Sequence, residues 1–473
     1  MPMILRHFYD PFLAQGSYLI GCQQTGAAIV IDPNRDIATY TAAAERDGLR
    51  IAYVTETHIH ADFVSGARDL ARATGATLLL SAEGGPDWQY GFATKDGARL
   101  IRDGDTIDVG AVRLVVCHTP GHTPEHLCFM VVDRATTDAP VGMLTGDFIF
   151  VGDVGRPDLL ERAANVRGTM DTLARALYRS LEGTRELPDH LLLWPGHGAG
   201  SACGKALGAM PSTTLGYERL ANWAFACETE EDFVAQVLAG QPEPPRYFAR
   251  MKAVNRDGPP PAPARAIPDV SLAALQRALA AGTPVIDARS TAAYAAGHIP
   301  GTLNIPVGTS FATWAGSLLP YDRDLIVLAD DDARVNQAVR LLAAIGLDHV
   351  AGRGGAAVRE AWQAHVGTLG TVTCLTPHDL APDGERLVMD VRGTADWRAG
   401  HLPFARHFFL GDLESRVADL PRDTPIAVAC EGGTRSAIAA SLLQARGFTD
   451  VANVTGGMRA CKAAGLPVET ESA

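Results

Sequence analysis

The chain has 473 residues, with 41 Lys and Arg against 54 Asp and Glu, and its formal net charge is −13. At roughly 150 residues per domain, this length predicts about three domains. The acidic balance argues against nucleic acid or an anionic membrane as a partner. Because 47% of the residues are apolar, the composition excludes a mostly disordered chain.

The cysteines and the amino-terminal residues indicate the cellular compartment in which the protein functions. Eight cysteines without a CxxC pair do not form the pattern of a disulfide framework, and loose thiols fit a reducing compartment. The first residues include Arg6, His7 and Asp10 where a signal peptide needs an apolar stretch, and no run of about 18 apolar residues predicts a spanning helix. We therefore expect a soluble cytoplasmic protein without a membrane partner.

The first block of the chain mixes short strands with helical patterns. The predicted elements are strands at 51–54, 76–80 and 142–145, a hairpin over 104–118 with its turn at Gly110, and helices at 65–73 and 165–181. Five prolines and a glycine then mark residues 255–268 as a stiff, extended linker. The order of these elements alone does not name a fold, but it predicts a first domain over 1–254.

The second half contains an internal repeat. Residues 285–300 are matched by 388–403 at an offset of 103, with an Asp-x-Arg strand end and a Gly-His turn in both copies. Each copy continues with an apolar strand and a helical pattern, which are 325–330 and 334–347 in the first copy and 425–430 and 435–448 in the second. Alternating strands and helices predict parallel sheets covered by helices on both faces. We expect one such α/β domain over 269–368 and another over 376–473.

Histidines and carboxylates gather where predicted strands of the first block end. The segment THIHADF follows the strand at 51–54, and three more polar residues follow later apolar runs in the same way. The candidate metal ligands are His58, His60, Asp62, His122, Asp147 and His197. Together they predict a metal site. His118 and His126 lie beside this set in the sequence, and a structural role is the favoured interpretation for both.

A second candidate site follows an apolar strand in the last domain. Its residues are Cys430, Glu431, Gly432, Gly433, Thr434 and Arg435. Backbone N–H groups and a helix N-terminus stabilise a thiolate in such a loop and can hold an anionic substrate. The first copy has three aspartates at 330–332 in the same place and no thiol, so we expect it to be inactive.

The first 250 residues resemble the metallo-β-lactamase fold, whose signature is His-x-His-x-Asp-His, and the resemblance implies an αββα sandwich. Phe63 stands where the signature ends in histidine. Dinuclear members use that histidine with the residues matching Asp62 and His197 for a second metal, so we expect a mononuclear site. Two imidazoles and one carboxylate are typical of non-haem Fe(II), and zinc stays open as an alternative.

The block is similar to the persulfide dioxygenase branch of that fold. This resemblance implies one Fe(II) per chain on His58, His122 and Asp147, with His60, Asp62 and His197 in the outer shell. Arg156 would then anchor a substrate carboxylate, and a structural ion pair with a nearby aspartate is its alternative role.

The two repeats resemble rhodaneses over residues 269–473, and Cys430 matches the cysteine that carries a persulfide in that family. Four residues separate Cys430 from Arg435, whereas related phosphatases have five, and the shorter loop suits sulfur. The combination resembles the composite CstB-type persulfide dioxygenase–sulfurtransferases, which implies Cys203 as a sulfur acceptor near the metal. We expect Lys205 to favour its thiolate, and a packed, buried thiol is the alternative.

These resemblances imply oxidation of a small-thiol persulfide with O2 to sulfite, coupled to formation or use of thiosulfate through Cys430. Glutathione, coenzyme A and cysteine stay open as carriers, and so does a homo-oligomer. One alternative is a zinc-dependent hydrolase of the glyoxalase II type with accessory rhodanese domains. Another is a sulfur carrier whose first domain has lost its activity.

Overall fold

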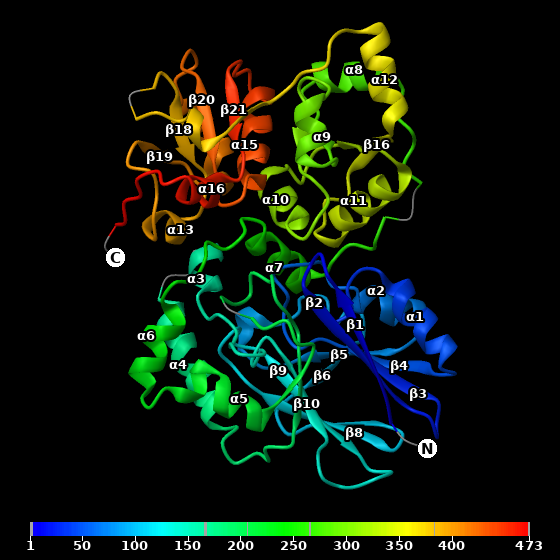
Figure 1. Ribbon diagram of the computed structural model, residues 1–473. Coiled ribbons are helices and arrows are strands. Elements are labelled where there is room, and N and C mark those ends of the chain that lie inside the picture. Colours follow the sequence, from blue (N-terminus) through cyan, green and yellow to red (C-terminus); the bar gives the residue numbers. More distant parts are fainter. Residues whose placement is uncertain (1–2, 165–167, 206, 264–265, 383, 472–473) are drawn as a thin grey trace. The chain divides into compact units, whose positions relative to one another are not determined.

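The computed structural model describes residues 3–164, 168–205, 207–263, 266–382 and 384–471 (Figure 1). The chain forms two compact units, one of residues 1–262 with 343–346 and the other of residues 263–342 with 347–473. Within the described ranges, we find no helix with the length and hydropathy needed to cross a membrane.

The first unit contains two six-stranded sheets. The first sheet has the order β1 (Met3–Asp10), β2 (Gln15–Cys22), β3 (Ala27–Ile31), β4 (Arg50–Thr55), β5 (Thr77–Ser81) and β6 (Arg99–Ile101). The second has the order β12 (Thr213–Thr214), β11 (Leu192–Pro195), β10 (Gly142–Gly146), β9 (Leu127–Asp133), β8 (Val112–His118) and β7 (Thr106–Val109). The hairpin predicted at Gly110 is present, since Val109 pairs with Val112 and the glycine adopts φ +64°.

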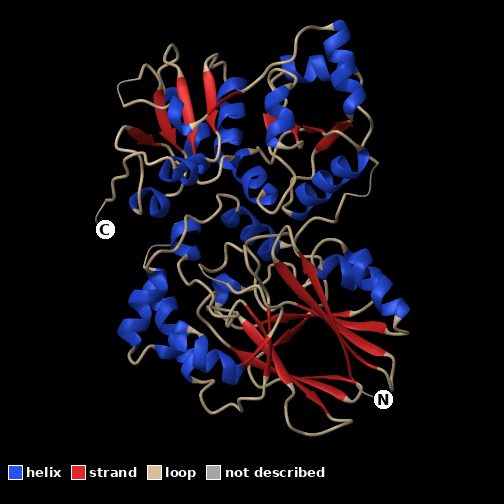
Figure 2. Cartoon of the chain, viewed as in Figure 1, coloured by secondary structure: helices blue, strands red, loops and turns tan. Residues whose placement is uncertain are grey.

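Alternating side chains divide the core of this unit into layers. Ile29 packs between the two sheets with Leu114 and Phe129, whereas its neighbour Val30 packs on the other face against helices. Helices α1 (Ile37–Arg46) and α2 (Ala67–Thr74) cover the first sheet, and α4 (Thr169–Glu182) and α6 (Glu230–Leu238) cover the second (Figure 2). The result is the predicted αββα sandwich. Of the helix predicted at 165–181, residues 165–167 lie outside the described residues.

The helix before the linker extends further than the sequence indicated. Helix α7 (Phe248–Asp257) includes the first three residues of the predicted linker. Asn255 is buried, and the helix ends at Gly258, whose φ is +111°. The polar residues of 255–257 are compatible with a helix, and the first proline comes only at 259, so the predicted boundary lies three residues too early.

The second unit contains the two repeats. The sheet of the first repeat has the order β14 (Leu303–Asn304), β13 (Val285–Asp287), β15 (Leu325–Leu328) and β16 (Val350–Gly354). The sheet of the second repeat has the order β17 (Thr373–Leu375), β21 (Val451–Val454), β20 (Ile426–Ala429), β18 (Leu387–Asp390) and β19 (Ala405–His407). All pairings in both sheets are parallel, which confirms the predicted fold class. The predicted helices are α11 (Asp332–Ala344) and α15 (Thr434–Ala445).

The repeated motif has a structural role in both copies. Arg289 forms an ion pair with Asp287 and donates to the carbonyl of Gly297, just before the Gly-His turn. Arg392 does the same with Asp390 and the carbonyl of Gly400. The motif therefore ties a strand end to a turn in each domain.

Candidate functional site

The predicted metal ligands lie at the ends of strands from both sheets of the first unit. His58 follows β4, His122 lies in the turn between β8 and β9, and Asp147 follows β10. Their ligand atoms all lie within 4.8 Å of one another. Asp147 Oδ2 is 3.4 Å from His122 Nε2 and 3.9 Å from His58 Nε2. Three residues far apart in the sequence thus converge in a buried cluster.

Hydrogen bonds on the far side of each ring direct its Nε2 into the cluster. Thr57 Oγ1 lies 2.9 Å from His58 Nδ1, and the same hydroxyl and the Thr57 N–H both donate to Asp32. His122 Nδ1 lies 3.0 Å from the carbonyl oxygen of Arg156. Metal-binding histidines are typically held in this way. Asp32 directly follows the apolar strand β3, so the pattern that indicated the other polar residues could also have indicated this one.

The cluster also has the charge that a cation requires. Burial and then His60 lower the pKa of His58 well below its usual value, and burial lowers that of His122. Burial opposes ionisation of Asp147, but the surrounding histidines, His197 first, hold its pKa below the usual value. Neutral imidazoles and an ionised carboxylate are the ligating forms. Both Asp147 oxygens are buried and have no hydrogen-bond partner among the residues that the structure describes, which fits a site built for a metal.

The other three candidates border this cluster. His60 Nε2 lies 3.1 Å from Asp32, and although burial opposes the charge, Asp32 raises the pKa of His60 to about 9. His197 Nε2 lies 3.3 Å from Asp62 and 3.5 Å from Asp147. Phe63 is fully buried with its ring centroid 4.5 Å from that of His60. The assignment of His58, His122 and Asp147 as the ligands, with the three other candidates beside them, stays a prediction. The observed geometry is compatible with it.

The two neighbouring histidines have structural partners. His126 Nε2 accepts a 3.0 Å hydrogen bond from the Asp147 N–H, and its Nδ1 lies 2.8 Å from Thr119 Oγ1. His118 Nε2 lies 2.8 Å from the carbonyl oxygen of Pro124. These contacts agree with the structural roles favoured for both residues.

The guanidinium of Arg156, the candidate anchor for a substrate carboxylate, is hydrogen-bonded within the protein. This group is fully buried and forms two hydrogen bonds with Asp158, at 2.7 and 2.8 Å. It also donates to the carbonyl oxygens of Ala202 and Pro242. This geometry corresponds to the structural ion pair, the alternative role of Arg156, and the fork that a substrate carboxylate would need is already occupied.

Cys203 lies next to the cluster. Its sulfur and the ligand atoms of Asp62 and His197 lie within 4.8 Å of one another. Burial, then Asp147 and Asp62, raise its pKa well above the usual value. The expectation that Lys205 favours the thiolate is wrong, because its ammonium donates to the carbonyl oxygens of Gln236 and Ala239 instead. The role of sulfur acceptor stays a prediction.

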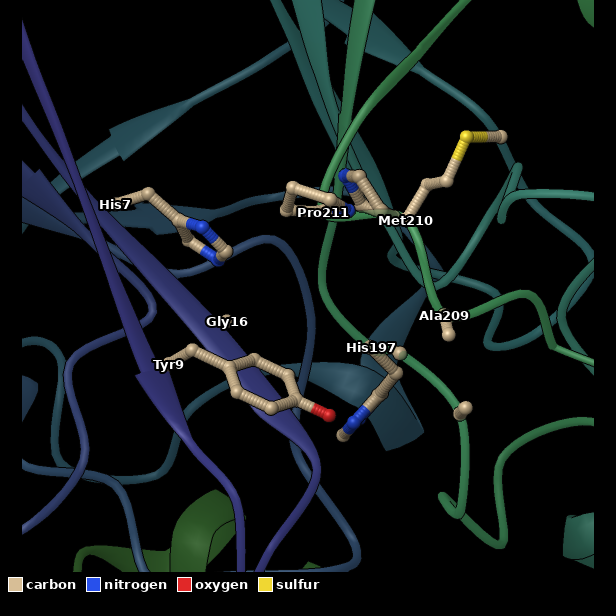
Figure 3. A pocket seen from close by; sticks show the side chains of 10 residues that line it. His7, Tyr9, Gly16, His197, Ala209, Met210 and Pro211 are labelled. Atoms are coloured by element: carbon tan, nitrogen blue, oxygen red, sulfur yellow. The ribbon is translucent and has the colours of Figure 1, made fainter.

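A cavity of about 400 Å³ borders His197 (Figure 3). His7 and Tyr9 from β1 face the segment of Met210 and Pro211 across it, and the Tyr9 hydroxyl is directed toward His197. No motif in the sequence surrounds His7. Its place in a cavity wall depends on the pairing of β1 with β2, which brings a strand remote in sequence beside the metal loops.

The thiol of Cys430 lies in the expected loop between β20 and α15. Its sulfur accepts hydrogen bonds from the Gly433 N–H at 3.1 Å and from the Ser436 hydroxyl at 3.3 Å. Gly433 adopts φ +102°, which favours glycine. Arg435 lies 3.1 Å from Asp396 at the edge of the loop. A backbone amide, a hydroxyl and a helix N-terminus therefore surround the sulfur.

The corresponding loop of the first repeat serves a different purpose. Asp331 Oδ1 accepts a 2.8 Å hydrogen bond from the Arg334 N–H in the first turn of α11, and Asp330 pairs with Arg359. Two of its three aspartates thus cap the helix or form an ion pair. No thiol is present to carry sulfur.

Comparisons with known proteins agree with this architecture. The metallo-beta-lactamase superfamily model matches residues 11–197, and the rhodanese-like domain model matches residues 271–355 and 378–464. The mitochondrial persulfide dioxygenase ETHE1 of Homo sapiens is 30% identical over 201 residues, which are 41% of this chain and 68% of that protein. Hydroxyacylglutathione hydrolase of Polaromonas sp. is 35% identical over 182 residues, which are 38% of this chain and 61% of that protein.

A solved structure extends the likeness into the second unit. The crystal structure of a metallo-beta-lactamase from Staphylococcus aureus is 42% identical, has a TM-score of 0.69, and covers 74% of this chain and 98% of that one. The chain therefore belongs to the metallo-β-lactamase superfamily, as an enzyme that joins a lactamase-fold domain to two rhodanese domains.

Proposed function

We propose that the chain is a persulfide dioxygenase joined to a sulfurtransferase. The first unit would oxidise the persulfide of a small thiol with O2 to sulfite at one Fe(II) per chain, and Cys430 would transfer sulfane sulfur. The observation that carries this proposal is the cluster of two neutral imidazoles and one carboxylate, His58, His122 and Asp147, with Phe63 in place of a further histidine.

The oxidation balances as RSS⁻ + O2 + H2O → RSH + SO3²⁻ + H⁺. When bound, iron would supply the redox chemistry that joins O2 to the terminal sulfur. Thr57 would hold the ring of His58 in place from behind, and the Arg156 carbonyl would hold that of His122. Because the three residues are at most 3% exposed, the protein would keep bulk water away from the reacting sulfur.

Sulfur transfer would use the loop of Cys430. The thiolate attacks the outer sulfur of a persulfide, the S–S bond breaks and the carrier thiol leaves. Sulfite then attacks the outer sulfur of the Cys430 persulfide, and thiosulfate leaves as the thiolate returns. The Gly433 N–H and the Ser436 hydroxyl would stabilise that thiolate each time it forms. The same steps can run in reverse, from thiosulfate to a thiol.

A zinc-dependent thioester hydrolase is the second candidate function. The identity to hydroxyacylglutathione hydrolase favours it, and a buried His/Asp site can hold zinc. Phe63 weighs against it, because a second ion would lose one imidazole ligand.

Metal analysis combined with oxygen uptake distinguishes the two functions. We expect one iron per chain and uptake with glutathione persulfide, and we expect His122→Ala to abolish that uptake. His190→Ala is the matched control, because His190 is exposed and lies outside the cluster. Zinc with thioester hydrolysis, and no uptake after anaerobic loading with Fe(II), would establish the hydrolase instead.

A further inference from the structure

Helix α7 lies beyond the segment that matches the lactamase model, yet it packs directly on the metal loop. The Asn255 amide donates to the carbonyl oxygens of His60 and Phe63 at 2.8 and 2.7 Å. Its carbonyl oxygen accepts a 2.9 Å hydrogen bond from the Ser65 N–H. Three hydrogen bonds from one buried side chain fix the helix against the loop that carries His58.

The same face of α7 carries a lysine. Phe248, Met251 and Asn255 are buried at a helical spacing, and Lys252 falls on the face that they define. Lys252 lines a small cavity with Phe248, Leu159, Leu160, His122 and, from the metal loop, Ile59. The cavity thus joins the helix to a predicted metal ligand.

The volume and lining of this cavity limit what it can hold. About 20 Å³ has room for roughly one water-sized group, so the cavity admits the end of a ligand and not its body. Leu159, Leu160 and Phe248 make much of the wall apolar. Among the described residues that line it, Lys252 carries the single cationic side chain other than histidine.

The ammonium of Lys252 is partly withdrawn from water. It lies 3.4 Å from the centroid of the Trp88 ring. Burial lowers the pKa of Lys252 to about 7, against the attraction of the buried Glu125. A partly desolvated cation beside an apolar cavity loses hydration, and an anion bound next to it offsets that loss.

We propose that Lys252 is the cationic contact for the anionic sulfur end of the substrate, where that end reaches His122. The inference rests on the proposed function and deepens it. The terminal sulfur of a persulfide is anionic near neutral pH and the product sulfite carries two charges, so both need a countercharge in an apolar cavity. Arg156 is already bound to Asp158 and is not available for this contact.

Kinetics with two carriers test the contact. Lys252→Met keeps the aliphatic stem, and we expect it to lower kcat/KM by roughly 10- to 100-fold. The loss should be equal for glutathione persulfide and for 2-hydroxyethyl persulfide, whose carrier group is uncharged. Lys252→Arg should restore most of the loss. The matched control is Lys205→Met, because Lys205 also lies over a tryptophan ring, that of Trp223. An unchanged kcat/KM, or a loss confined to glutathione persulfide, would overturn the proposal.

Fluorescence gives a readout that needs no turnover. Sulfite added without oxygen should draw the Lys252 ammonium away from Trp88 and change a signal that is absent in Trp88→Phe and in Lys252→Met. If the protein oxidised no persulfide and this signal were present, the dioxygenase would be wrong and the anion contact right. If it oxidised persulfide and Lys252→Met behaved like the parent in both assays, the contact would be wrong and the dioxygenase right.

Discussion

Thr57 connects the first predicted ligand to the rest of the protein. Its hydroxyl lies between His58 Nδ1 and Asp32, and Asp32 reaches it from a backbone position with φ +52°. A group that hydrogen-bonds to the ring nitrogen not bound to the metal sets the orientation and basicity of a metal-binding imidazole. Thr57, next to His58 in the sequence, therefore orients the ring of this predicted ligand.

Removal of that hydroxyl should weaken metal binding. We expect Thr57→Val to lower the affinity for the metal by about 10- to 100-fold, because His58 loses its orienting partner. Competition with a chelator measures the change. Thr55→Val is the control, since the Thr55 hydroxyl is buried with no hydrogen-bond partner among the described residues. Equal affinities in the two variants would contradict the role of Thr57.

The sequence predicted which residues converge but not how each is held. Polar residues that follow apolar strands indicated His58, His122 and Asp147, but not that β4 belongs to one sheet and β8, β9 and β10 to the other. The sequence offered a nearby aspartate as an alternative partner of Arg156, but its other partners could not be found in this way. Two of them are carbonyl oxygens of the loops at Ala202 and Pro242, and only the folded chain brings those loops back to the guanidinium.

At the scale of elements, the N-terminus of α16 (Gly457–Ala463) supports the Cys430 loop. The Met458 N–H donates to the Cys430 carbonyl at 2.7 Å, and the Arg459 N–H donates to that of Glu431 at 3.2 Å. Gly457 adopts φ +56°, and a Cβ on it would lie 2.0 Å from the Cys430 carbonyl oxygen. The strand, loop and helix that present the thiol thus depend on a second helix behind them.

Gly457→Ala should therefore displace the Cys430 loop. A shift of about 1 Å in a reacting group can reduce a rate roughly 100-fold, and we expect a loss of that order in thiosulfate sulfurtransferase activity. Oxygen uptake with persulfide should be retained. Gly308→Ala is the matched control in the same unit, because a Cβ there meets no atom within 4 Å. Full transferase activity in Gly457→Ala would show that the loop does not need this close approach.

The elements themselves followed from the sequence wherever a periodic apolar pattern was present. The predicted helix at 334–347 corresponds to α11, and the hairpin at 104–118 to β7 and β8. The linker was predicted to start at residue 255, whereas helix α7 continues to Asp257, and the difference has a physical reason. Asn255 appears as a solvent-exposed residue in sequence, whereas it satisfies three backbone groups of the metal loop.

At the scale of the whole molecule, each unit has its own sheets and its own buried core. In the first unit, the two sheets pack against each other and helices cover their outer faces. The second unit contains two parallel sheets, and each has its own buried core. The predicted ligand cluster lies entirely within the first unit and the Cys430 loop entirely within the second. Because the described residues that form each of these sites belong to a single unit, a point change at one site should leave the other chemistry intact.

Two variants of the full chain test this independence. His122→Ala should lose oxygen uptake and keep transfer of sulfur from thiosulfate to a thiol. Cys430→Ser should lose that transfer and consume oxygen as before, so that sulfite accumulates in place of thiosulfate. The intact chain should follow 2 RSS⁻ + O2 + H2O → S2O3²⁻ + 2 RSH, whereas Cys430→Ser should release one sulfite per O2. Cys374→Ser, which changes an exposed thiol of the same unit, is the control. If Cys430→Ser also lost oxygen uptake, the oxidation would need the persulfide on Cys430, and the two sites would be steps of one reaction.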